Sequence, residues 1–348
     1  MTETRDVVIV GVDTHADVHV AVVIDHVGRV QGTLEIPTTA AGFRQLVCWA
    51  RRFGTLQRVG VEGTGSYGAG LARYLASEGV DVIEVNRPNR QRRRRRGKSD
   101  PTDAEAAARA VLSGEAAVVP KTHIGIVESI RVIHVVRRSA VKARTQAGNQ
   151  IKDLVLTAPD SIRDGLRPLN TRQRALRASR WRPTDELDPT ATTKRALRTL
   201  ARRWLDLTAE IKSHDRDLLR MLNVAAPSVL AEPGAGSDVA AKLVIAAGQN
   251  PDRLRTEACF AALCGASPVP ASSGKTQRHR LNRGGDRQAN NALWTVAFHR
   301  RHCDPETRHY FERRRKEGLD DREIMRCLKR HLARRFHHLL VKDLAALT

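Results

Sequence analysis

The sequence predicts an α/β domain followed by an all-α region, and three observations lead to this expectation. Over residues 1–118, short apolar runs alternate with turn residues, as they do where strands and helices interleave. From residue 126 onward, apolar residues recur at the 3.6-residue spacing of long helices. With 348 residues, 41% of them hydrophobic and 28% charged, the chain is expected to fold into two or three domains.

The first part of the chain predicts a mixed sheet within a domain of residues 1–118. Three consecutive strand-like runs open it, and helical and strand patterns then alternate. The expected strands cover residues 6–15, 17–25, 29–37, 57–63 and 80–86, and the expected helices cover residues 39–53, 65–79 and a segment that begins at Asp100.

Residues 119–222 predict a long helical coiled-coil hairpin. Residues 127–156 and 192–222 keep helical periodicity and are expected to pair as antiparallel helices. Residues 159–190 hold four prolines and little periodicity, which favours a connector. A hairpin this long usually packs against a copy of itself or braces two domains.

The remaining residues, 223–348, predict a third, mainly helical domain. Its Pro-Gly-Ala-Gly segment, residues 233–236, has two interpretations: a helix-hairpin-helix turn whose N–H groups hold a phosphate, or a plain glycine-rich connector. Five scattered cysteines without a C-x-x-C pair predict reduced, mostly buried thiols.

The net charge of +22 requires a polyanionic partner, and nucleic acid is the ordinary one. Arginine outnumbers lysine by 49 to 11, and aromatic residues make up only 4%, which favours phosphate contacts over base stacking. The sequence has no apolar run near the roughly 20 residues of a membrane span and begins without signal-peptide anatomy. We expect a cytoplasmic, nucleoid-associated protein with no membrane partner.

Residues 87–98 are the most cationic stretch, and Arg92, Arg93, Arg94, Arg95, Arg96 and Lys98 are its nucleic-acid-binding candidates. Taken alone, the run could equally be a solvated charge cluster. Two carboxylates, Asp100 and Asp103, follow it at once and lie three residues apart, so both can face one point from a helix.

Asp13 and Glu62 close two predicted strands, and neighbouring strand ends bring side chains to one edge of a sheet. Four converging carboxylates would raise each other's pKa values unless cations compensated them. Mg²⁺ or Mn²⁺ suits such oxygen ligands and can clamp a phosphodiester. Individually, Asp100 could be only a helix N-cap, and the strand-end residues could be only turn residues.

The segments "GVDTH", "VEGTGSYG" and "RRGKSDPTDAEAAARA", in this order, resemble the DEDD transposases of bacterial insertion sequences, the Piv-like or IS one-ten (IS110) family. The segment "LCGASPVPASSGKTQRHRLNRGGDRQANNAL" resembles the second domain of that family. The resemblance covers essentially the whole chain.

The resemblance implies a RuvC-like, ribonuclease-H-type N-terminal domain with Asp13, Glu62, Asp100 and Asp103 as its acidic tetrad. It also implies a serine nucleophile directly before a glycine, which here is Ser273. The adjacent Ser272 stays an alternative, and "SSGK" alone would be a flexible turn. The basic residues nearby are expected to bind the DNA or RNA backbone: Lys275, Arg278, Arg280, Arg283 and Arg287. His279 is a candidate base.

The family further implies donor and target DNA as substrates, a structured guide RNA encoded by the element, and a homo-oligomer such as a tetramer or dimer of dimers. Strand exchange would then pass through a 5′-phosphoserine. Two other functions stay open: a metal-dependent nuclease or junction resolvase in which water attacks, and a non-catalytic nucleic-acid-binding protein.

Overall fold

The computed structural model describes residues 7–85, 99–184, 187–274 and 279–347. The chain divides into two compact units. The first comprises residues 1–125 together with 247–256, and the second comprises residues 126–246 together with 257–348. Apart from residues 119–125 and 247–256, which belong to the first unit, the predicted hairpin and the predicted C-terminal domain fall within the second unit.

The first unit is built on a mixed sheet of five strands in the order β3-β2-β1-β4-β5. The strands are β1 (Val7–Thr14), β2 (Val18–Asp25), β3 (Val30–Pro37), β4 (Thr55–Glu62) and β5 (Asp81–Val85). β1, β2 and β3 pair antiparallel, whereas β4 runs parallel to both β1 and β5. The expected mixed sheet and the expected order of strands and helices are confirmed.

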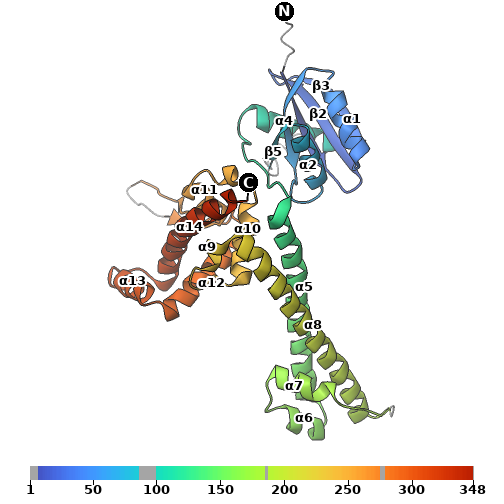
Figure 1. Ribbon diagram of the computed structural model, residues 1–348, viewed down its shortest axis with the longest axis vertical. Helices are drawn as coiled ribbons and strands as arrows, with labels where there is room; N and C mark the ends of the chain where they lie inside the picture. Colours follow the sequence, from blue (N-terminus) through green and yellow to red (C-terminus); the bar gives the residue numbers. More distant parts are fainter. Residues whose placement is uncertain (1–6, 86–98, 185–186, 275–278, 348) are drawn as a thin grey trace, which may run out of the picture. The chain divides into compact units, whose positions relative to one another are not determined.

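Helices cover both faces of this sheet (Figure 1). α1 (Ala40–Ala50) and α2 (Ala69–Ser77) pack on one face, where Val8, Val10 and Val12 of β1 join their core. α4 (Asp100–Leu112) packs on the other face, where Ile9 of β1 joins a second core. The alternation of β1 residues between the two cores follows from the two-residue period of a strand.

Two long antiparallel helices, α5 (Gly125–Thr157) and α8 (Pro189–Ala225), form the predicted hairpin. Arg137 Nε lies 2.6 Å from Asp215 Oδ1, and further along the pair Gly148 lies against the Trp204 indole. Residue numbers thus rise on α5 as they fall on α8, as antiparallel packing requires.

The segment between the two long helices is more regular than the sequence indicates. It contains α6 (Asp160–Leu166) and α7 (Thr171–Ser179). Asn170 and Gln173 form a reciprocal capping box at the start of α7, and Ala175 and Ala178 are buried against the ends of α5 and α8. Helices this short owe their stability to such packing, which periodicity alone does not reveal.

The rest of the second unit is mainly helical, as predicted. Its elements are α9 (Pro227–Leu230), α10 (Ser237–Ala247), α11 (Glu257–Leu263), the β6 (Val269–Pro270) and β7 (His279–Arg280) pair, α12 (Arg287–Cys303), α13 (Pro305–Lys316) and α14 (Asp321–Ala345). A 3-10 helix at Pro251–Leu254 belongs to the first unit. α14 contacts α9, α11, α12 and α13 and so forms the centre of this region.

All five cysteines are free thiols, but the expectation that most are buried is wrong. Only Cys264 is buried, whereas Cys48, Cys259 and Cys303 are exposed and Cys327 is half-buried. The exposed cysteines lie on the outer faces of amphipathic helices. Among the described residues, no helix combines the length and apolar character that crossing a membrane would require.

Candidate active site

The α4 side of the sheet gathers the predicted carboxylates because of strand alternation. Gly11 and Gly60 face α4 and lie opposite each other in the parallel β1–β4 pair. Two residues further along, Asp13 and Glu62 follow on the same side of their strands. The register therefore places both side chains on the face that α4 covers.

The two glycines allow α4 to approach the sheet closely. A Cβ on Gly11 would lie 2.1 Å from the Ala104 carbonyl oxygen and 2.3 Å from the Ala108 nitrogen. A Cβ on Gly60 would lie 2.7 Å from Val111 Cγ2. Any larger residue at either position would push the helix away from β1 and β4.

The first turn of α4 carries Asp100 and Asp103. Ser99 has the extended backbone of an N-cap residue and Asp100 is the first helical residue, so the interpretation of Asp100 as an N-cap is wrong. Asp103 is only 3% exposed and Asp13 only 8% exposed. Negative side chains are favoured at a helix N-terminus, which helps to hold Asp100 and Asp103 in the first turn of α4.

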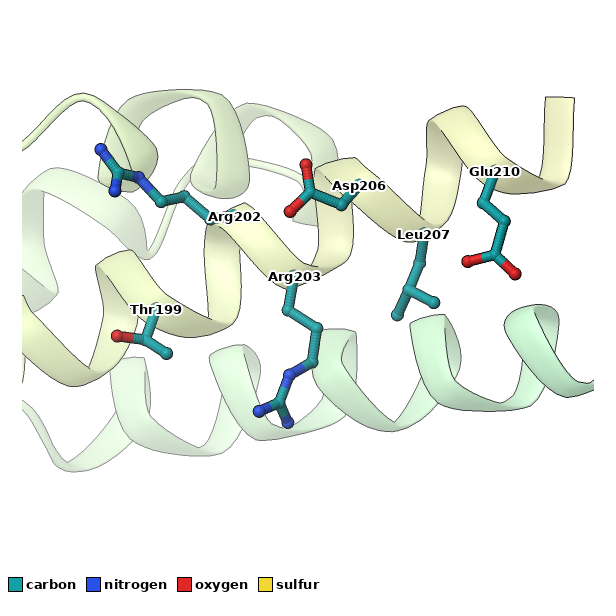
Figure 2. Close-up of a pocket in the computed structure, with 6 residues that line it drawn as sticks. All are labelled: Thr199, Arg202, Arg203, Asp206, Leu207 and Glu210. Carbon is teal, nitrogen blue, oxygen red and sulfur yellow. The ribbon is translucent and has the colours of Figure 1, made fainter. Parts of the chain in front are cut away.

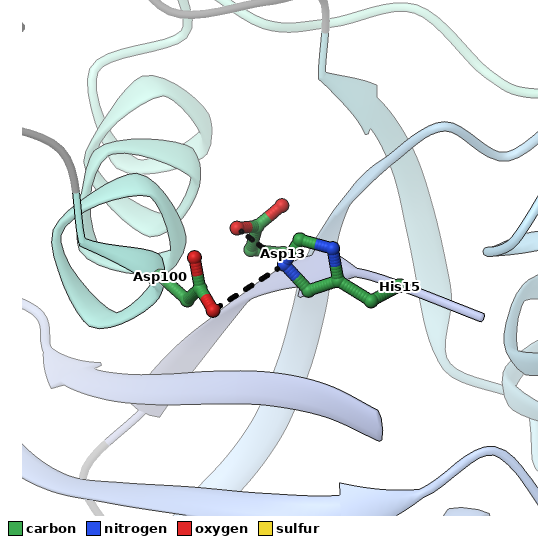
Figure 3. A group of neighbouring side chains, drawn as sticks. All are labelled: Asp13, His15 and Asp100. Atoms are coloured by element: carbon green, nitrogen blue, oxygen red, sulfur yellow. Dashed lines mark ion pairs between the residues drawn. The ribbon is translucent and has the colours of Figure 1, made fainter. Parts of the chain in front are cut away.

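One group of side chains comes together at this position (Figure 3). His15 Nε2 lies 3.3 Å from Asp13 Oδ2 and 3.5 Å from Asp100 Oδ2. The three residues each offer a ligand atom, and these atoms all lie within 4.8 Å of one another. Among the described residues, this group contains neither Glu62 nor Asp103.

Burial raises the pKa of the Asp13 carboxyl above its usual value, because a buried carboxylate loses hydration. The nearby imidazole of His15 opposes this change, whereas the carboxylates of Asp103 and Asp100 add to it. Asp103 is therefore close enough to act on Asp13 electrostatically. The site carries excess negative charge that a cation would relieve.

His15 is the site residue that the sequence interpretation missed. It stands two positions after Asp13 in "GVDTH", beyond the end of β1 (Val7–Thr14). A single histidine in a turn is not distinctive. Its place between Asp13 and Asp100 depends on the approach of α4, which only the folded structure shows.

The predicted nucleophile belongs to the second unit. Ser272 and Ser273 are exposed and follow β6, whose residues Val269 and Pro270 pair with β7. Gly274 has a φ of +54°, a left-handed conformation that favours glycine after the serine. The loop thus places both serine residues at the surface.

Several predicted nucleic-acid contacts lie outside the described residues, namely Arg92, Arg93, Arg94, Arg95, Arg96, Lys98, Lys275 and Arg278. The described ones, Arg280, Arg283 and Arg287, are all exposed.

The turn that carries Arg283 is firmly held. Asn282 Nδ2 donates to Ser267 Oγ at 3.0 Å, and the Gly284 N–H donates to Asn282 Oδ1 at 2.9 Å. Asp286 then caps α12 by accepting hydrogen bonds from the backbone N–H groups of Gln288 and Ala289.

A groove runs along α8 beside α5 (Figure 2). Its lining residues are Thr199, Arg202, Arg203, Asp206, Leu207 and Glu210. Two arginines are followed there by two carboxylates, all exposed along the turns of one helix, which is typical of a solvated helix face. We therefore place the candidate active site at the carboxylate group.

Carboxylates gathered on one face of an α/β sheet, in a strongly basic chain, are typical of enzymes that act on nucleic acids. Family comparisons define the class. Residues 10–158 match the DEDD transposase family of IS110, and residues 227–312 match the family described as "Transposase IS116/IS110/IS902 family". The chain belongs to the IS110 family of transposases, and DNA is therefore its substrate class. No curated protein sequence matches the chain.

Proposed function

We propose that this transposase exchanges DNA strands by using two separate sets of residues. Asp13, Glu62, Asp100 and Asp103 form the metal-binding tetrad of a RuvC-like domain, and Ser273 is the nucleophile. The observation that carries the proposal is the proximity of Asp13, Asp100 and Asp103 on the α4 face of the sheet, with Asp13 and Asp103 buried. The order β3-β2-β1-β4-β5, with α4 packed over β1, supports the RuvC-like assignment.

The side chains present fit a divalent cation that prefers oxygen. Asp13 and Asp100 offer carboxylate oxygens within one small group, and Asp103 adds negative charge beside them. We assign Mg²⁺ or Mn²⁺ to this set. Such an ion supplies positive charge that stabilises phosphate oxygens during displacement. The end of β1 carries Asp13 and the first turn of α4 carries Asp100 and Asp103, so the packing of these two elements holds the carboxylates beside one another.

Ser273 would carry out the covalent step. Its Oγ attacks the phosphorus, an Oγ–P bond forms, and the P–O3′ bond breaks. The DNA is left with a 5′-phosphoserine and a 3′-oxygen that takes a proton. His279, exposed on β7, is the candidate that removes the serine proton.

Rejoining reverses these bonds. The 3′-hydroxyl of the exchange partner attacks the phosphorus, and Ser273 regains its proton. One phosphodiester is made for each one broken, so the exchange needs no nucleotide cofactor. Arg280, Arg283 and Arg287, with Lys275 and Arg278, would hold the phosphate backbone.

The proposal includes assembly and guidance. The carboxylates of one subunit would meet the serine of another in a homo-oligomer, a tetramer or dimer of dimers joined through the α5–α8 hairpin. A guide RNA encoded by the element would select donor and target by pairing. The protein would act in the cytoplasm at the nucleoid.

The test is a search for a covalent adduct. Purified protein is mixed with Mg²⁺, RNA transcribed from the element's end and a labelled DNA that carries the element's junction, and the products are separated on a denaturing gel. We expect a protein–DNA adduct with the wild type and with Ser272→Ala. We expect none with Ser273→Ala or Asp103→Ala.

Other outcomes would select other functions. Metal-dependent cutting without any adduct, lost only in Asp103→Ala, would indicate a nuclease or junction resolvase in which water attacks. DNA binding that Asp13→Ala and Asp103→Ala leave unchanged, with no cutting at all, would indicate a non-catalytic nucleic-acid-binding protein. An adduct lost in Ser272→Ala and kept in Ser273→Ala would move the nucleophile by one residue.

A further inference from the structure

The outer face of α12 carries an unusual set of exposed side chains. Arg287, Asn291, Trp294, Phe298 and His302 are all exposed and follow one another at intervals of three or four residues. Residues at this spacing share one face of a helix. The opposite face is buried, through Ala289, Ala292, Leu293, Val296 and Ala297.

The aromatic side chains on this face contact one another, and Trp294 and Phe298 are stacked, whereas Phe298 and His302 are tilted by 50°. The ring centroids of Trp294 and Phe298 lie 5.0 Å apart with an interplanar angle of 19°, and the Phe298 and His302 rings lie 4.6 Å apart. Trp294 is nevertheless 44% exposed and Phe298 46% exposed. We call Trp294, Phe298 and His302 the aromatic ladder. In a chain with only 4% aromatic residues, this exposed ladder indicates a partner whose own flat rings can stack on it.

The charges around the ladder favour a polyanion as that partner. α12 contains no Asp or Glu after its N-cap, and Arg287, one end of the exposed face, makes no salt bridge to any described residue. Arg283, in the preceding turn, is exposed as well. A nucleic-acid strand matches this pattern, because it alternates phosphates with flat bases.

Unpaired bases fit the ladder better than a duplex does. In a duplex the bases are stacked on each other and present only their edges, whereas a single strand leaves its base faces open to aromatic side chains. The transposase acts on DNA, and cleaved or exchanging strands pass through an unpaired state. The partner is accordingly taken to be DNA.

We propose that the exposed face of α12 binds single-stranded DNA, with bases stacked on Trp294 and Phe298 and a phosphate held by Arg287. This site lies beyond the serine and carboxylate residues, and its assignment to unpaired DNA rests on the strand exchange proposed above. It assigns a site for the unpaired segment of the substrate, in a part of the chain where the sequence indicates only backbone contacts.

The test measures binding of the full chain to a labelled oligo-dT strand in buffer with EDTA, so that cleavage plays no part. An abasic strand of the same length supplies the same phosphates without bases. We expect the wild type to bind oligo-dT more tightly than the abasic strand. Base–aromatic stacking of the usual strength predicts a rise in Kd of about fivefold or more for Trp294→Leu and for Phe298→Leu.

Leucine is chosen because it keeps an apolar side chain and removes only the aromatic face. Phe298→Tyr should restore oligo-dT binding. Phe53→Leu is the matched control: Phe53 is exposed, packs edge-on against Trp49 in the first unit, and should not change Kd. Thermal unfolding of each variant verifies that it is folded.

Three results would overturn the proposal. The first is an unchanged Kd for oligo-dT in Trp294→Leu and Phe298→Leu. The second is dissociation of an oligomer by these variants, measured by sedimentation, with binding to oligo-dT per chain preserved, which would make the face a contact between copies. The third is tighter binding of an RNA strand of matched sequence with the same dependence on Phe298, which would assign the face to RNA.

Discussion

Gly11 lies directly against the backbone of Ala104, so that even one methyl group on Gly11 would reach within 2.1 Å of the Ala104 carbonyl oxygen. This contact joins β1 to α4 and brings Asp13 to the first turn of that helix. The geometry of the candidate site therefore depends on a residue that bears no functional group.

Gly11→Ala should damage both stability and activity. Because a backbone atom is in the way, α4 must shift, and overpacking of this kind usually costs about 1–3 kcal/mol. The shift would move Asp100 and Asp103 away from Asp13, so strand cleavage should fall by more than the unfolded fraction explains. Urea unfolding and cleavage assays measure the two effects.

The matched control for this change is Gly165→Ala in α6. A Cβ at Gly165 would lie 3.7 Å from Arg177 Nη2, an ordinary contact. Its unfolding midpoint should not fall, and its cleavage rate should stay near that of the wild type. Wild-type cleavage by Gly11→Ala would contradict the role given to the β1–α4 contact.

Asp13→Asn should stabilise the protein while it abolishes cleavage. Burial raises the pKa of Asp13, so the folded state holds the charged form less well than the unfolded state does. Removing the charge should raise the free energy of unfolding by about 0.5–2 kcal/mol at pH 7 in EDTA. Stabilising substitutions at functional sites commonly have effects of this size. Thermal unfolding is the measurement.

The pH dependence of this difference has a definite sign. A carboxyl with a raised folded pKa favours folding when protonated, so the wild type regains the stability as pH falls through that pKa. The advantage of Asp13→Asn should therefore shrink toward zero in acid. A variant less stable than the wild type at pH 7 in EDTA would show that Asp13 is a structural residue.

Much of the candidate site follows from sequence, because strand periodicity is a local property. The ends of β1 and β4 could be located from apolar runs, and their side chains follow from alternation. The spacing of Asp100 and Asp103 likewise defines a helix face. These features depend on residues close together along the chain.

The remaining features depend on tertiary approach, which no local pattern reports. Gly11 and Gly60 are ordinary residues in strand-like runs until the β1–β4 register places them opposite each other. His15 gains its position only when α4 docks. The helices α6 and α7 likewise form because the ends of α5 and α8 supply a surface for them.

Asp238→Asn should destabilise the second unit. Burial tends to raise the pKa of Asp238, but hydrogen bonds from His134 and Lys242 and the charges of Lys242 and Arg137 lower it well below its usual range. Because the Asp238 side chain is 36% exposed, solvent screening weakens these charge-assisted bonds, and their loss should cost about 1–2 kcal/mol at pH 7. Because a depressed pKa gives stability above the unfolded pKa, the deficit should begin to shrink as pH falls below about 4 and should vanish only as pH falls through the lower pKa of the folded state.

Asp217→Asn is the control for this change. Asp217 Oδ1 lies 3.8 Å from Arg220 in an exposed pair of the same unit. Such pairs contribute little, so the unfolding free energy should change by less than about 1 kcal/mol. Equal effects of the two substitutions would refute the stabilising role of the Asp238 network.

Asn290→Ala should loosen the contact between α12 and the turn that follows α11. The Asn290 side chain donates to the Cys264 carbonyl at 2.7 Å and accepts from the buried Lys329 ammonium at 3.0 Å. Its loss leaves Lys329 without that partner and should lower the free energy of unfolding by about 2–4 kcal/mol. Chemical denaturation measures the loss. Asn291→Ala, an exposed neighbour on α12 bound to Lys242, should cost less than about 1 kcal/mol.

The exposed arginines after the serine loop should govern the salt dependence of duplex DNA binding. Each phosphate contact contributes a slope of about −0.9 to the plot of log affinity against log salt. Arg280→Ala and Arg283→Ala should each reduce the slope by about one while affecting all sequences alike, because phosphate contacts carry no base information. Arg163→Ala is the control, because Arg163 already pairs with Asp160 at 2.6 Å in α6. This substitution should leave the slope unchanged. An unchanged slope in both Arg280→Ala and Arg283→Ala would place the DNA backbone elsewhere on the chain, whereas a reduced slope with unchanged sequence preference would locate it beside Ser273.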